Sequence, residues 1–373
     1  MQEEQLVASL DKLLLSALDK RASDIHFEPY HNYYRIRMRI DGVLQDMLTP
    51  PFSLAKQIAA RLKIMANLNI AEQRLPQDGQ LMIDRYAMRI STLPVINGEK
   101  IVLRVMDNQE SKLTINDLGL SADNLLSFQK LLDYPQGLIL VTGPTGSGKT
   151  VTLYSGLKRL NRSDRNICSV EDPIEVPIEG INQTSVNIKA GLTFSVILRA
   201  LLRQDPDVMM IGEIRDQETA EIAIQAAQTG HLVLSTLHTN SSIEALTRLN
   251  QMGIENYLLS SSLKLIIAQR LVRKLCNYCK VVSNQLIFLG DEAIPHHIAT
   301  GCSHCIGGYK GRMGLYEFLV LTPEIQHQIL THQLSVPASM ITLKQAGYKM
   351  IKDGITSVAE LHRVLGDLYE KAL

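Results

Sequence analysis

The sequence predicts a small α+β domain followed by a larger α/β domain with a largely parallel, buried sheet. A chain of 373 residues is too long for one average domain. Its first part carries short alternating segments that end at tight-turn signals, a pattern typical of antiparallel hairpins. Its later part alternates uninterrupted apolar runs with helical segments, a pattern typical of a parallel sheet covered by helices.

The composition is that of an ordinary globular protein. The 38 Lys and Arg residues balance the 38 Asp and Glu residues, so no overall field attracts nucleic acid or an anionic membrane. With 45% hydrophobic residues, the chain still has no window long and apolar enough to span a bilayer. The acidic start, Met1–Gln5, lacks the basic and apolar regions of a signal peptide. We therefore expect a cytoplasmic protein.

The first domain, residues 1–106, is predicted to combine an amphipathic helix with two hairpins. Leucines recur at helical spacing from Glu3 to Lys20, which favours a packing helix. Arginines alternate with apolar residues from Arg35 to Ile40, ahead of an Asp41-Gly42 turn. A further helix is expected at Ser53–Leu68. A second hairpin is expected around Asn97-Gly98, with strands at Arg89–Leu93 and Lys100–Val105.

The second part of the chain begins after a polar run without periodicity, residues 107–113, which is the expected linker. An α/β core is predicted next, then a cysteine-rich subdomain, then helices that end in Val358–Leu373. These three parts are expected at residues 114–270, 271–319 and 320–373. The apolar runs expected as buried parallel strands of the core are Leu138–Val141, Val208–Ile211 and Leu232–Leu237.

A phosphate-binding loop is predicted between the strand Gly137–Val141 and a following helix. The segment Gly143-Pro144-Thr145-Gly146-Ser147-Gly148-Lys149-Thr150 matches the P-loop pattern in full. Its glycines let backbone amides face the phosphates, Lys149 reaches the outer phosphates and Thr150 holds Mg²⁺. A glycine-rich turn with an incidental lysine is disfavoured because pattern and context agree. We therefore expect ATP and Mg²⁺ as cofactors.

Acidic residues and histidines at the ends of the expected strands are candidates to act on the nucleotide. Glu213 follows the run Val208–Ile211 and is the first choice to polarise the attacking water, although Gly212 stands where many such strands carry aspartate. A second acidic pair ends the strand Ile167–Val170, and taken alone it is better explained as exposed loop acids. Two histidines flank Leu232–Leu237, and each alone is better explained as a satisfied structural residue. These pairs are Glu171 and Asp172, and His231 and His238.

Four of the five cysteines form two CxxC pairs. The span between Cys276-x-x-Cys279 and Cys302-x-x-Cys305 is slightly longer than the roughly 15 to 20 residues typical of zinc ribbons. Four thiolates suit a closed, structural Zn²⁺ site, and disulfides are disfavoured in a reducing cytosol. Cys168 lies in an apolar strand and is expected in the core.

Several motifs, taken in order, resemble the bacterial type II secretion and type IV pilus assembly ATPases, a branch of the secretion ATPase superfamily. The resemblance extends over most of the chain. Besides the P-loop, the segments that carry it are Ala22–Pro29, Arg74–Gly79, Ser169–Glu175, Asp205–Asp207, Gly212–Asp216, Thr229–His231 and Ser235–Asn240.

The resemblance implies a RecA-like P-loop NTPase core that hydrolyses ATP as the motor of a machine. It also implies a homo-hexamer that docks on an inner-membrane platform protein, at the cytoplasmic face of the bacterial inner membrane. Membrane association would be peripheral, and no nucleic acid is expected as a partner.

The resemblance further implies roles that spacing alone does not give. Glu171 and Asp172 match the aspartate box of the family, with Glu171 a second catalytic candidate, and Glu213 matches its variant Walker B motif. The two histidines match the histidine box, which senses nucleotide. Three arginines match residues of the N-terminal domain that close over the phosphates, although two of them read alone as solvated strand residues. They are Arg74, Arg89 and Arg104, the last two being the strand residues.

The cysteine pairs and the segment Gly311–Glu317 look like the secretion and pilus-extension branch, because retraction motors generally lack the zinc element. Many members carry a further N-terminal docking domain, whereas here the chain begins almost directly at the arginine-bearing domain, as a fragment or a short member. The alternatives are a competence-pilus or retraction motor, a nucleic-acid translocase with the same core, and a nucleotide-gated scaffold. Balanced charge and the lack of a basic, aromatic-interleaved track disfavour the translocase. Intact Lys149, Thr150 and Glu213 disfavour the scaffold.

Overall fold

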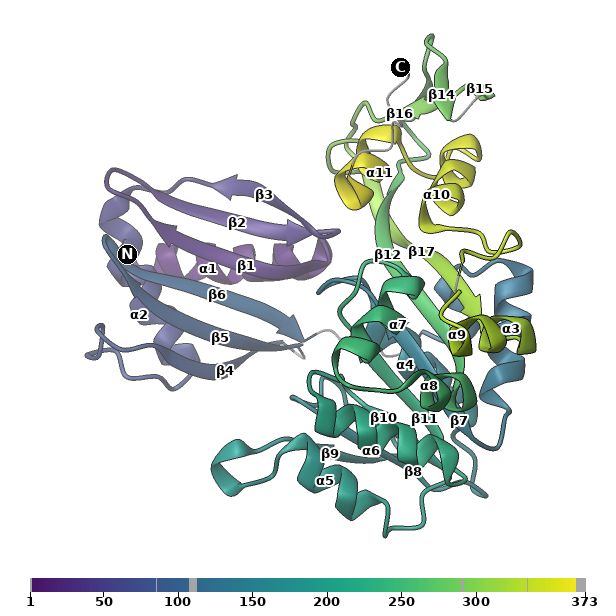
Figure 1. Ribbon diagram of the computed structural model, residues 1–373. Helices are drawn as coiled ribbons and strands as arrows, with labels where there is room; N and C mark the ends of the chain where they lie inside the picture. The colour runs from purple at the N-terminus through teal and green to yellow at the C-terminus, as the bar shows by residue number, and fades with distance from the viewer. Residues whose placement is uncertain (1, 85, 107–112, 290–291, 334, 367–373) are drawn as a thin grey trace. The chain divides into compact units, whose positions relative to one another are not determined.

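The computed structural model describes residues 2–84, 86–106, 113–289, 292–333 and 335–366. The chain divides into two compact units, residues 1–109 and 110–373 (Figure 1). Residues 107–112 of the expected linker lie outside the described residues, as do residues 367–373 of the expected C-terminal helix.

The first unit is a six-stranded antiparallel sheet with the strand order β3-β2-β1-β6-β5-β4, and helices α1 and α2 pack on one of its faces (Figure 1). Alternating apolar residues such as Ile25, Met38 and Leu103 are fully buried against these helices. The two expected hairpins are confirmed as β2–β3 and β5–β6. The bounds are α1 Gln2–Asp19, β1 Ala22–Pro29, β2 Tyr34–Ile40, β3 Val43–Leu48, η1 Phe52–Leu54, α2 Ala55–Met65, β4 Gln77–Ile83, β5 Tyr86–Val95 and β6 Gly98–Met106.

Helix α1 is a packing helix, as its leucine spacing predicts. Leu10, Leu14 and Ala17 are buried, and the helix contacts β1, β4 and α2. Within the described part of the chain, no helix combines the length and the apolar character needed to cross a membrane.

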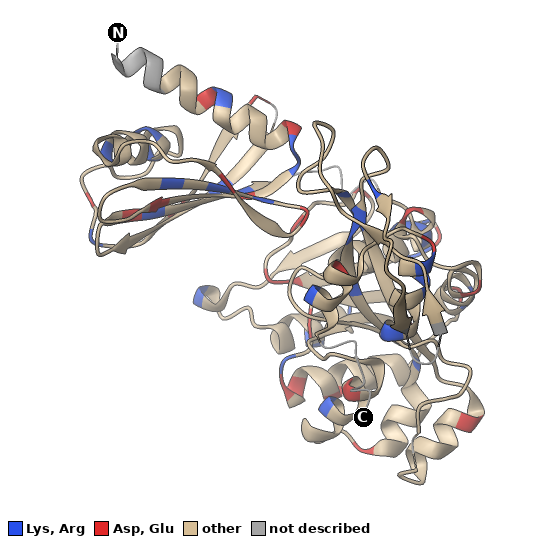
Figure 2. Ribbon diagram, turned by 90° about the horizontal axis from the view of Figure 1, so that it is seen from above, with Lys and Arg blue, Asp and Glu red and all other residues tan. Residues whose placement is uncertain are grey.

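The other face of the six-stranded sheet carries charged side chains, and Figure 2 shows basic and acidic residues interspersed along its strands. Glu28 on β1 is the best-connected acid of this face, and its side chain is only 5% exposed. Its oxygens accept hydrogen bonds from Nε and Nη2 of Arg37, each at 2.9 Å, and from Nε of Arg35 at 3.3 Å. Lys100 Nζ lies 3.2 Å away. Burial alone would raise the pKa of Glu28, but the bonds to Arg37 and Lys100 hold it at about 2.

The second unit is built on a seven-stranded sheet with the order β17-β12-β7-β11-β10-β8-β9. All neighbours pair in parallel except β17, which runs antiparallel to β12. Side chains of β7 alternate between two cores, with Leu140 facing α5 to α8 and Val141 facing α3 and α4. The strand bounds are β7 Gly137–Thr142, β8 Ile167–Glu171, β9 Asn182–Ser185, β10 Val208–Ile211, β11 Leu232–Leu237, β12 Leu263–Leu275 and β17 Tyr309–Val320.

Helices cover both faces of this sheet (Figure 1), which confirms the predicted α/β class. They begin with capping side chains at most N-termini, for example Thr193 before α5 and Asp216 before α6. The bounds are η3 Ile115–Leu118, α3 Ala122–Leu132, α4 Lys149–Leu160, η4 Ile188–Ala190, α5 Phe194–Leu201, α6 Gln217–Gln228, α7 Ser242–Gln251, α8 Asn256–Ser262, α9 Pro323–Leu330, α10 Leu343–Lys352 and α11 Val358–Leu365.

The C-terminal part shares the central sheet. The subdomain boundary expected at residues 270 and 271 falls inside β12, and β17 returns alongside β12 as far as Leu265. Leu315 of β17 packs with Leu343 and Ile351 of α10, which joins the C-terminal helices to this strand pair. The short strands described between β12 and β17 are β13 Val281–Val282, β14 Ile287–Leu289, β15 Glu292–Ile294 and β16 His297–Ile298.

We predict that Glu28→Gln destabilises the first unit by about 2 kcal/mol at pH 7, because hydrogen bonds to a charged, buried acceptor are lost. The folded-state pKa of Glu28 is depressed to about 2, so its ionised form stabilises the fold above pH 4.5 and this contribution is lost as the pH falls toward 2. The stability difference between wild type and Glu28→Gln should therefore shrink over that window, measured by hydrogen exchange of the amides of β1, β2 and β6.

The exposed Asp78 on β4 provides a matched control, because Asp78→Asn should change the same amides by less than about 0.5 kcal/mol. A pH-independent difference for Glu28→Gln would contradict the assignment.

Candidate functional site

The predicted phosphate loop lies between β7 and α4 at the carboxyl edge of the parallel sheet. Gly143 and Gly148 adopt φ values of +153° and +87°, which favour glycine and allow the chain to turn into the helix. A Cβ atom at Gly143 would lie 2.4 Å from the carbonyl oxygen of Gln269 and 2.6 Å from Ser147 Oγ. The loop is therefore held directly against β12.

The loop presents hydrogen-bond donors that fit an anion. Gly148 occupies the N-cap position of α4 and offers no capping side chain, so the first amides of the helix remain available. Ser147 Oγ is buried and has no hydrogen-bond partner among the described residues. Uncapped amides at a helix start and an unsatisfied hydroxyl are what a bound phosphate requires. The residues present thus fit the phosphates of a nucleotide, and Thr150 follows at the position expected to hold Mg²⁺.

Lys149 is folded back onto the loop that precedes it. Its Nζ donates to the carbonyl oxygens of Gly143 at 2.8 Å and Pro144 at 3.1 Å. Burial lowers the pKa of Lys149 to about 8, the charge of Glu213 opposes this shift, and the charge of Arg270 adds to it. A bound polyanion would raise this pKa again, because it would place negative charge beside the buried ammonium group.

Glu213 and His238 come together at the same edge of the sheet. Glu213 is 16% exposed, forms an ion pair with Arg215, and has its Oε2 3.5 Å from His238 Nε2. Arg215 also lies 3.8 Å from Asp172, whose side chain is 38% exposed. The pKa of His238 is lowered, first by burial and then by the charge of Lys149. The fold therefore gathers four of the sequence-predicted residues, Lys149, Glu213, His238 and Asp172, into one charged group.

Gly212, which stands where many such strands carry aspartate, lies close to the backbone of β8. A Cβ at this position would lie 3.3 Å from the carbonyl oxygen of Val170 and 3.4 Å from Glu171 Cα. The Gly212 amide donates to the Val170 carbonyl at 2.8 Å. The end of β10 therefore packs closely on β8, and Glu213 is the first acidic residue after this strand.

Glu171 is buried, so its interpretation as an exposed loop acid is wrong. Its oxygens accept hydrogen bonds from Ser169 Oγ at 2.6 Å, from Gln183 Nε2 at 3.0 Å and from the hydroxyl of Tyr154. Burial and this carboxylate raise the pKa of Tyr154. In this arrangement Glu171 links α4 to β8 and β9, and its bonds leave Glu213 as the more accessible carboxylate.

His231 lies far along β11 from the phosphate loop of the same chain. Leu232 pairs with Gly137 and Leu237 with Thr142, so the two histidines lie at opposite ends of the strand. Only His238 is at the end where the loop begins. His231 Nδ1 lies 3.0 Å from the carbonyl oxygen of Ala226, the contact of a satisfied structural histidine. A single chain therefore does not unite the two predicted histidines.

The three predicted arginines all belong to the first unit. Arg89 on β5 and Arg104 on β6 are directly opposite each other, and both are exposed. Arg74 precedes β4, is 89% exposed and lies 3.4 Å from Glu72. The sheet therefore brings Arg89 and Arg104 together, while Arg74 stands apart from that pair in the chain.

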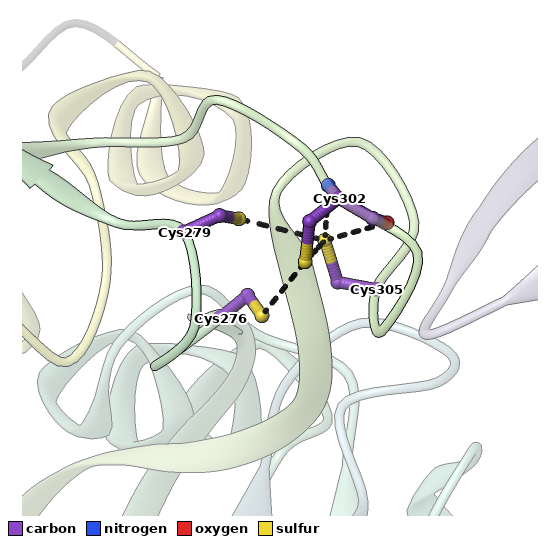
Figure 3. Close-up of side chains that lie close together, drawn as sticks. All are labelled: Cys276, Cys279, Cys302 and Cys305. Atoms are coloured by element: carbon purple, nitrogen blue, oxygen red, sulfur yellow. Dashed lines mark hydrogen bonds between the residues drawn. The ribbon is translucent and has the colours of Figure 1, made fainter.

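The four paired cysteines converge as a metal site requires (Figure 3). The Sγ atoms lie within 4.8 Å of one another. Sγ–Sγ distances are 3.8 Å for Cys276 and Cys302, and 3.7 Å for both Cys279–Cys305 and Cys302–Cys305. A tetrahedral Zn²⁺ with Zn–S bonds of about 2.3 Å places its ligands about 3.8 Å apart. The cluster thus fits the predicted zinc, and Cys168 is buried in β8, as expected.

Two residues of β12 belong to the site, although no motif indicated them. Gln269 Oε1 accepts a hydrogen bond from Thr152 Oγ1 at 2.7 Å, and its backbone supports Gly143. Arg270, almost fully buried, donates to the backbone and side-chain oxygens of Asn240 at 3.0 and 3.2 Å. The sequence signal for these two residues was a polar pair in the middle of the apolar run of β12. Buried polar side chains need fixed partners, so such a pair indicates specific contacts.

A mostly parallel sheet that delivers a complete phosphate loop to its carboxyl edge, with an acid following a neighbouring strand, defines a RecA-like P-loop NTPase. The family described as "Type II/IV secretion system protein" matches residues 1–363. The chain belongs to this family, and the predicted resemblance is confirmed.

Relatives include proteins of both machines. The chain is 54% identical over 375 residues to "Protein transport protein HofB homolog" of Escherichia coli K12, covering 96% of this chain and 81% of that one. It is 47% identical over 388 residues to "Type IV pilus assembly ATPase PilB" of Acinetobacter baylyi, covering 98% and 67%. It is 45% identical over 377 residues to "Type II secretion system ATPase E" of Vibrio cholerae, covering 96% and 75%.

Solved structures share the fold. The pilus retraction motor PilT, crystallised with bound ADP, is 26% identical and superposes with a TM-score of 0.64, covering 96% of this chain and 97% of that one. The ATPase DotB of Legionella pneumophila is 21% identical with a TM-score of 0.71, covering 95% of both chains. The predicted fold class is therefore confirmed.

We predict that Gly143→Ala weakens nucleotide binding. Its Cβ would clash with the Gln269 carbonyl and Ser147 Oγ, so the loop must shift. Losing one or two charge-assisted hydrogen bonds of about 1.5 kcal/mol each corresponds to a loss of on the order of 10- to 100-fold in affinity, measured with a fluorescent nucleotide.

The matched control is Gly191→Ala. Gly191 also has a positive φ of +76°, but nothing lies within 4 Å of its Cβ position. This variant carries backbone strain without a clash and should bind nucleotide normally. Wild-type affinity in Gly143→Ala would show that the loop does not hold the phosphates.

Proposed function

We propose that this chain is the ATP-hydrolysing motor subunit of a type II secretion or type IV pilus assembly machine. The observation that carries this proposal is the group of Lys149, Glu213 and His238 at the sheet edge beside a complete phosphate loop, within a chain matched over residues 1–363 by the family. The relatives named as a pilus assembly ATPase and a secretion ATPase support the activity.

The proposed chemistry assigns one task to each group. Lys149 and the loop amides bind the phosphates of ATP, Thr150 contributes to binding Mg²⁺, and Glu213 polarises the attacking water. His238 senses nucleotide through Glu213, since their side chains are neighbours. Asp172 and Arg215 keep this group charged and oriented. Glu171, which accepts hydrogen bonds from Tyr154, Ser169 and Gln183 inside the fold, is the weaker candidate for the water step.

The arginines of the first unit are proposed to act on the same nucleotide. A phosphate loop neutralises one side of a triphosphate and leaves charge on its outer oxygens. Arg89 and Arg104, adjacent and exposed on one sheet face, would supply positive charge there, with Arg74 as a third contributor. Coupling such contacts to ATP turnover would convert chemistry into domain movement. His231 would require a neighbouring copy of the chain for a role in nucleotide sensing.

The assembly proposed is a homo-hexamer at the cytoplasmic face of the inner membrane, where it would drive a membrane-embedded platform protein. Identity of 45% and 47% to the secretion and assembly relatives, against 26% to a retraction motor, favours the secretion and extension branch. The tetracysteine cluster supports the same branch, and Zn²⁺ there would bind the chain between β12 and β17 together.

We predict that Glu213→Gln binds ATP with near wild-type affinity but loses turnover by at least about 100-fold, since a group that handles the proton of the attacking water typically contributes 10² to 10⁴ in rate. Lys149→Ala should weaken binding as well as turnover. Binding is measured by nucleotide titration, and turnover by phosphate release.

The exposed acid Glu218, at the start of α6, gives the matched control, and Glu218→Gln should hydrolyse ATP normally. Near wild-type turnover in Glu213→Gln would remove Glu213 from the mechanism and promote Glu171.

We predict one Zn²⁺ per chain, held by the four paired cysteines. Zinc bound to such sites contributes about 10 to 16 kcal/mol of apparent free energy, so Cys276→Ser should lose the metal and expose the amides of β13 to β16 to exchange. Elemental analysis and hydrogen exchange measure the two effects. Cys168→Ala, which removes a buried thiol outside the cluster, should keep its zinc. Native protein purified without zinc would contradict the assignment.

A further inference from the structure

Two nearly buried carboxylates lie on the charged face of the first unit. Asp24 and Glu28 both point outward from β1, between the cationic strands β2 and β6. In the sheet register Asp24 is opposite Arg39 on one side and Arg104 on the other. The side chains of Asp24 and Glu28 are only 9% and 5% exposed, although helices α1 and α2 pack on the opposite face. Their cationic neighbours therefore cover them.

Asp24 is shared among three donors. Its Oδ1 accepts a hydrogen bond from Arg104 Nε at 2.9 Å. Its Oδ2 accepts one from Ser23 Oγ at 2.9 Å and lies 3.6 Å from Arg39 Nε. The carboxylate is thus fixed by its own strand and by both neighbouring strands. Any movement of Asp24 would be passed directly to the guanidinium of Arg104.

The two carboxylates hold their arginines differently. Glu28 binds both Nε and Nη2 of Arg37, which uses one complete edge of that guanidinium. Asp24 binds Arg104 through Nε, and no bond from Nη1 or Nη2 of Arg104 occurs among the described residues. Arg104 remains 70% exposed despite its ion pair. The guanidinium of Arg104 is therefore held at Nε, while Nη1 and Nη2 remain available to another group.

We infer that Asp24 is a positioning residue for Arg104, and that it presents the terminal nitrogens of that guanidinium to a phosphate group. The inference rests on the proposed function, in which Arg104 acts on ATP. Two terminal N–H groups in a fixed plane match two phosphate oxygens, and an arginine already held at Nε loses less side-chain freedom on binding. Arg89, directly opposite Arg104 on β5, would bring a second guanidinium to the same anion.

Asp24 does not contribute to the apolar core of the first unit. The apolar core of the unit lies on the opposite face, where Ile25 and Phe27 of the same strand are fully buried. Removing only the charge, as in Asp24→Asn, keeps the shape of the side chain and one oxygen acceptor. Such a change loosens Arg104 while leaving the core contacts intact.

The test is a double-mutant cycle on ATP turnover by the full chain under assembled conditions. Asp24→Asn should lower kcat by about 10- to 100-fold, as a misplaced group does, with little change in KM. In an Arg104→Ala background, Asp24→Asn should have no further effect, because its target is gone. Arg104→Lys should behave like Arg104→Ala, since an ammonium has no second edge to present.

Glu28→Gln is the matched control, because it removes the charge of a neighbouring carboxylate that holds arginines outside the proposed set. Any loss of kcat that it causes should multiply with that of Arg104→Ala. Asp24→Glu, which keeps the charge but moves it by one methylene, should lie between wild type and Asp24→Asn. Hydrogen exchange of β1 and β6 identifies a variant that is merely unfolded.

The outcomes separate this inference from the proposed function. If Arg104→Ala lowers kcat but Asp24→Asn does not, Asp24 has no positioning role and the arginine hypothesis stands. If Asp24→Asn multiplies with Arg104→Ala, Asp24 acts through another group and the inference is overturned. If Arg104→Ala turns over ATP at the wild-type rate, the arginine part of the proposed function fails, and the inference fails with it.

Discussion

The nucleotide site depends on the parallel pairing of β7 with β11 and β12. This register places the residues that follow each strand at one edge, where Thr142 at the end of β7 shares a 2.7 Å hydrogen bond with Thr239 after β11. The Thr239 amide donates to the same hydroxyl at 2.9 Å, so the segment that carries His238 is tied to the strand that carries the phosphate loop. Strand β12 packs against Gly143 on the side of β7 opposite β11. A shift of β11 or β12 would therefore move the phosphate loop.

The sequence was sufficient for the parts of this site that are local in the chain. Lys149 is specified by a contiguous motif, and Glu213 by its place after a buried strand, since parallel strands bring such residues to one edge. The nucleotide role of His238 was predicted only from the resemblance to the family. The same reasoning failed to separate His231 from His238, because it did not use the direction of β11. The burial of Glu171 depends on Tyr154 and Gln183, contacts that only the packed helix and edge strand reveal.

Most of the fold was also predictable, and the main exception has a physical reason. A hairpin can be recognised in the sequence because its two strands are adjacent and joined by a tight turn. The CxxC pairs can be recognised by their spacing. The antiparallel partner of β12 is β17, and the whole cysteine region lies between these two strands in the chain, so no local pattern predicts that they pair. A boundary at residue 270 follows naturally from an apolar run that ends near a cysteine pair. The strand instead continues to Leu275, so the metal site extends directly from the sheet that holds the phosphate loop.

Charge balance over the whole chain conceals a local excess on the first unit. The outward face of β1, β2 and β6 carries Arg35, Arg37, Arg39, Lys100 and Arg104 around only two acids on β1, Asp24 and Glu28. Burying those two acids among the arginines keeps the cations from repelling one another, at the cost of desolvating both carboxylates. Hydrogen bonds from Arg37 and Lys100 keep the pKa of Glu28 low despite its burial. The remaining positive charge is concentrated on side chains that stay exposed, so this face suits a phosphate partner better than the net charge of zero would suggest.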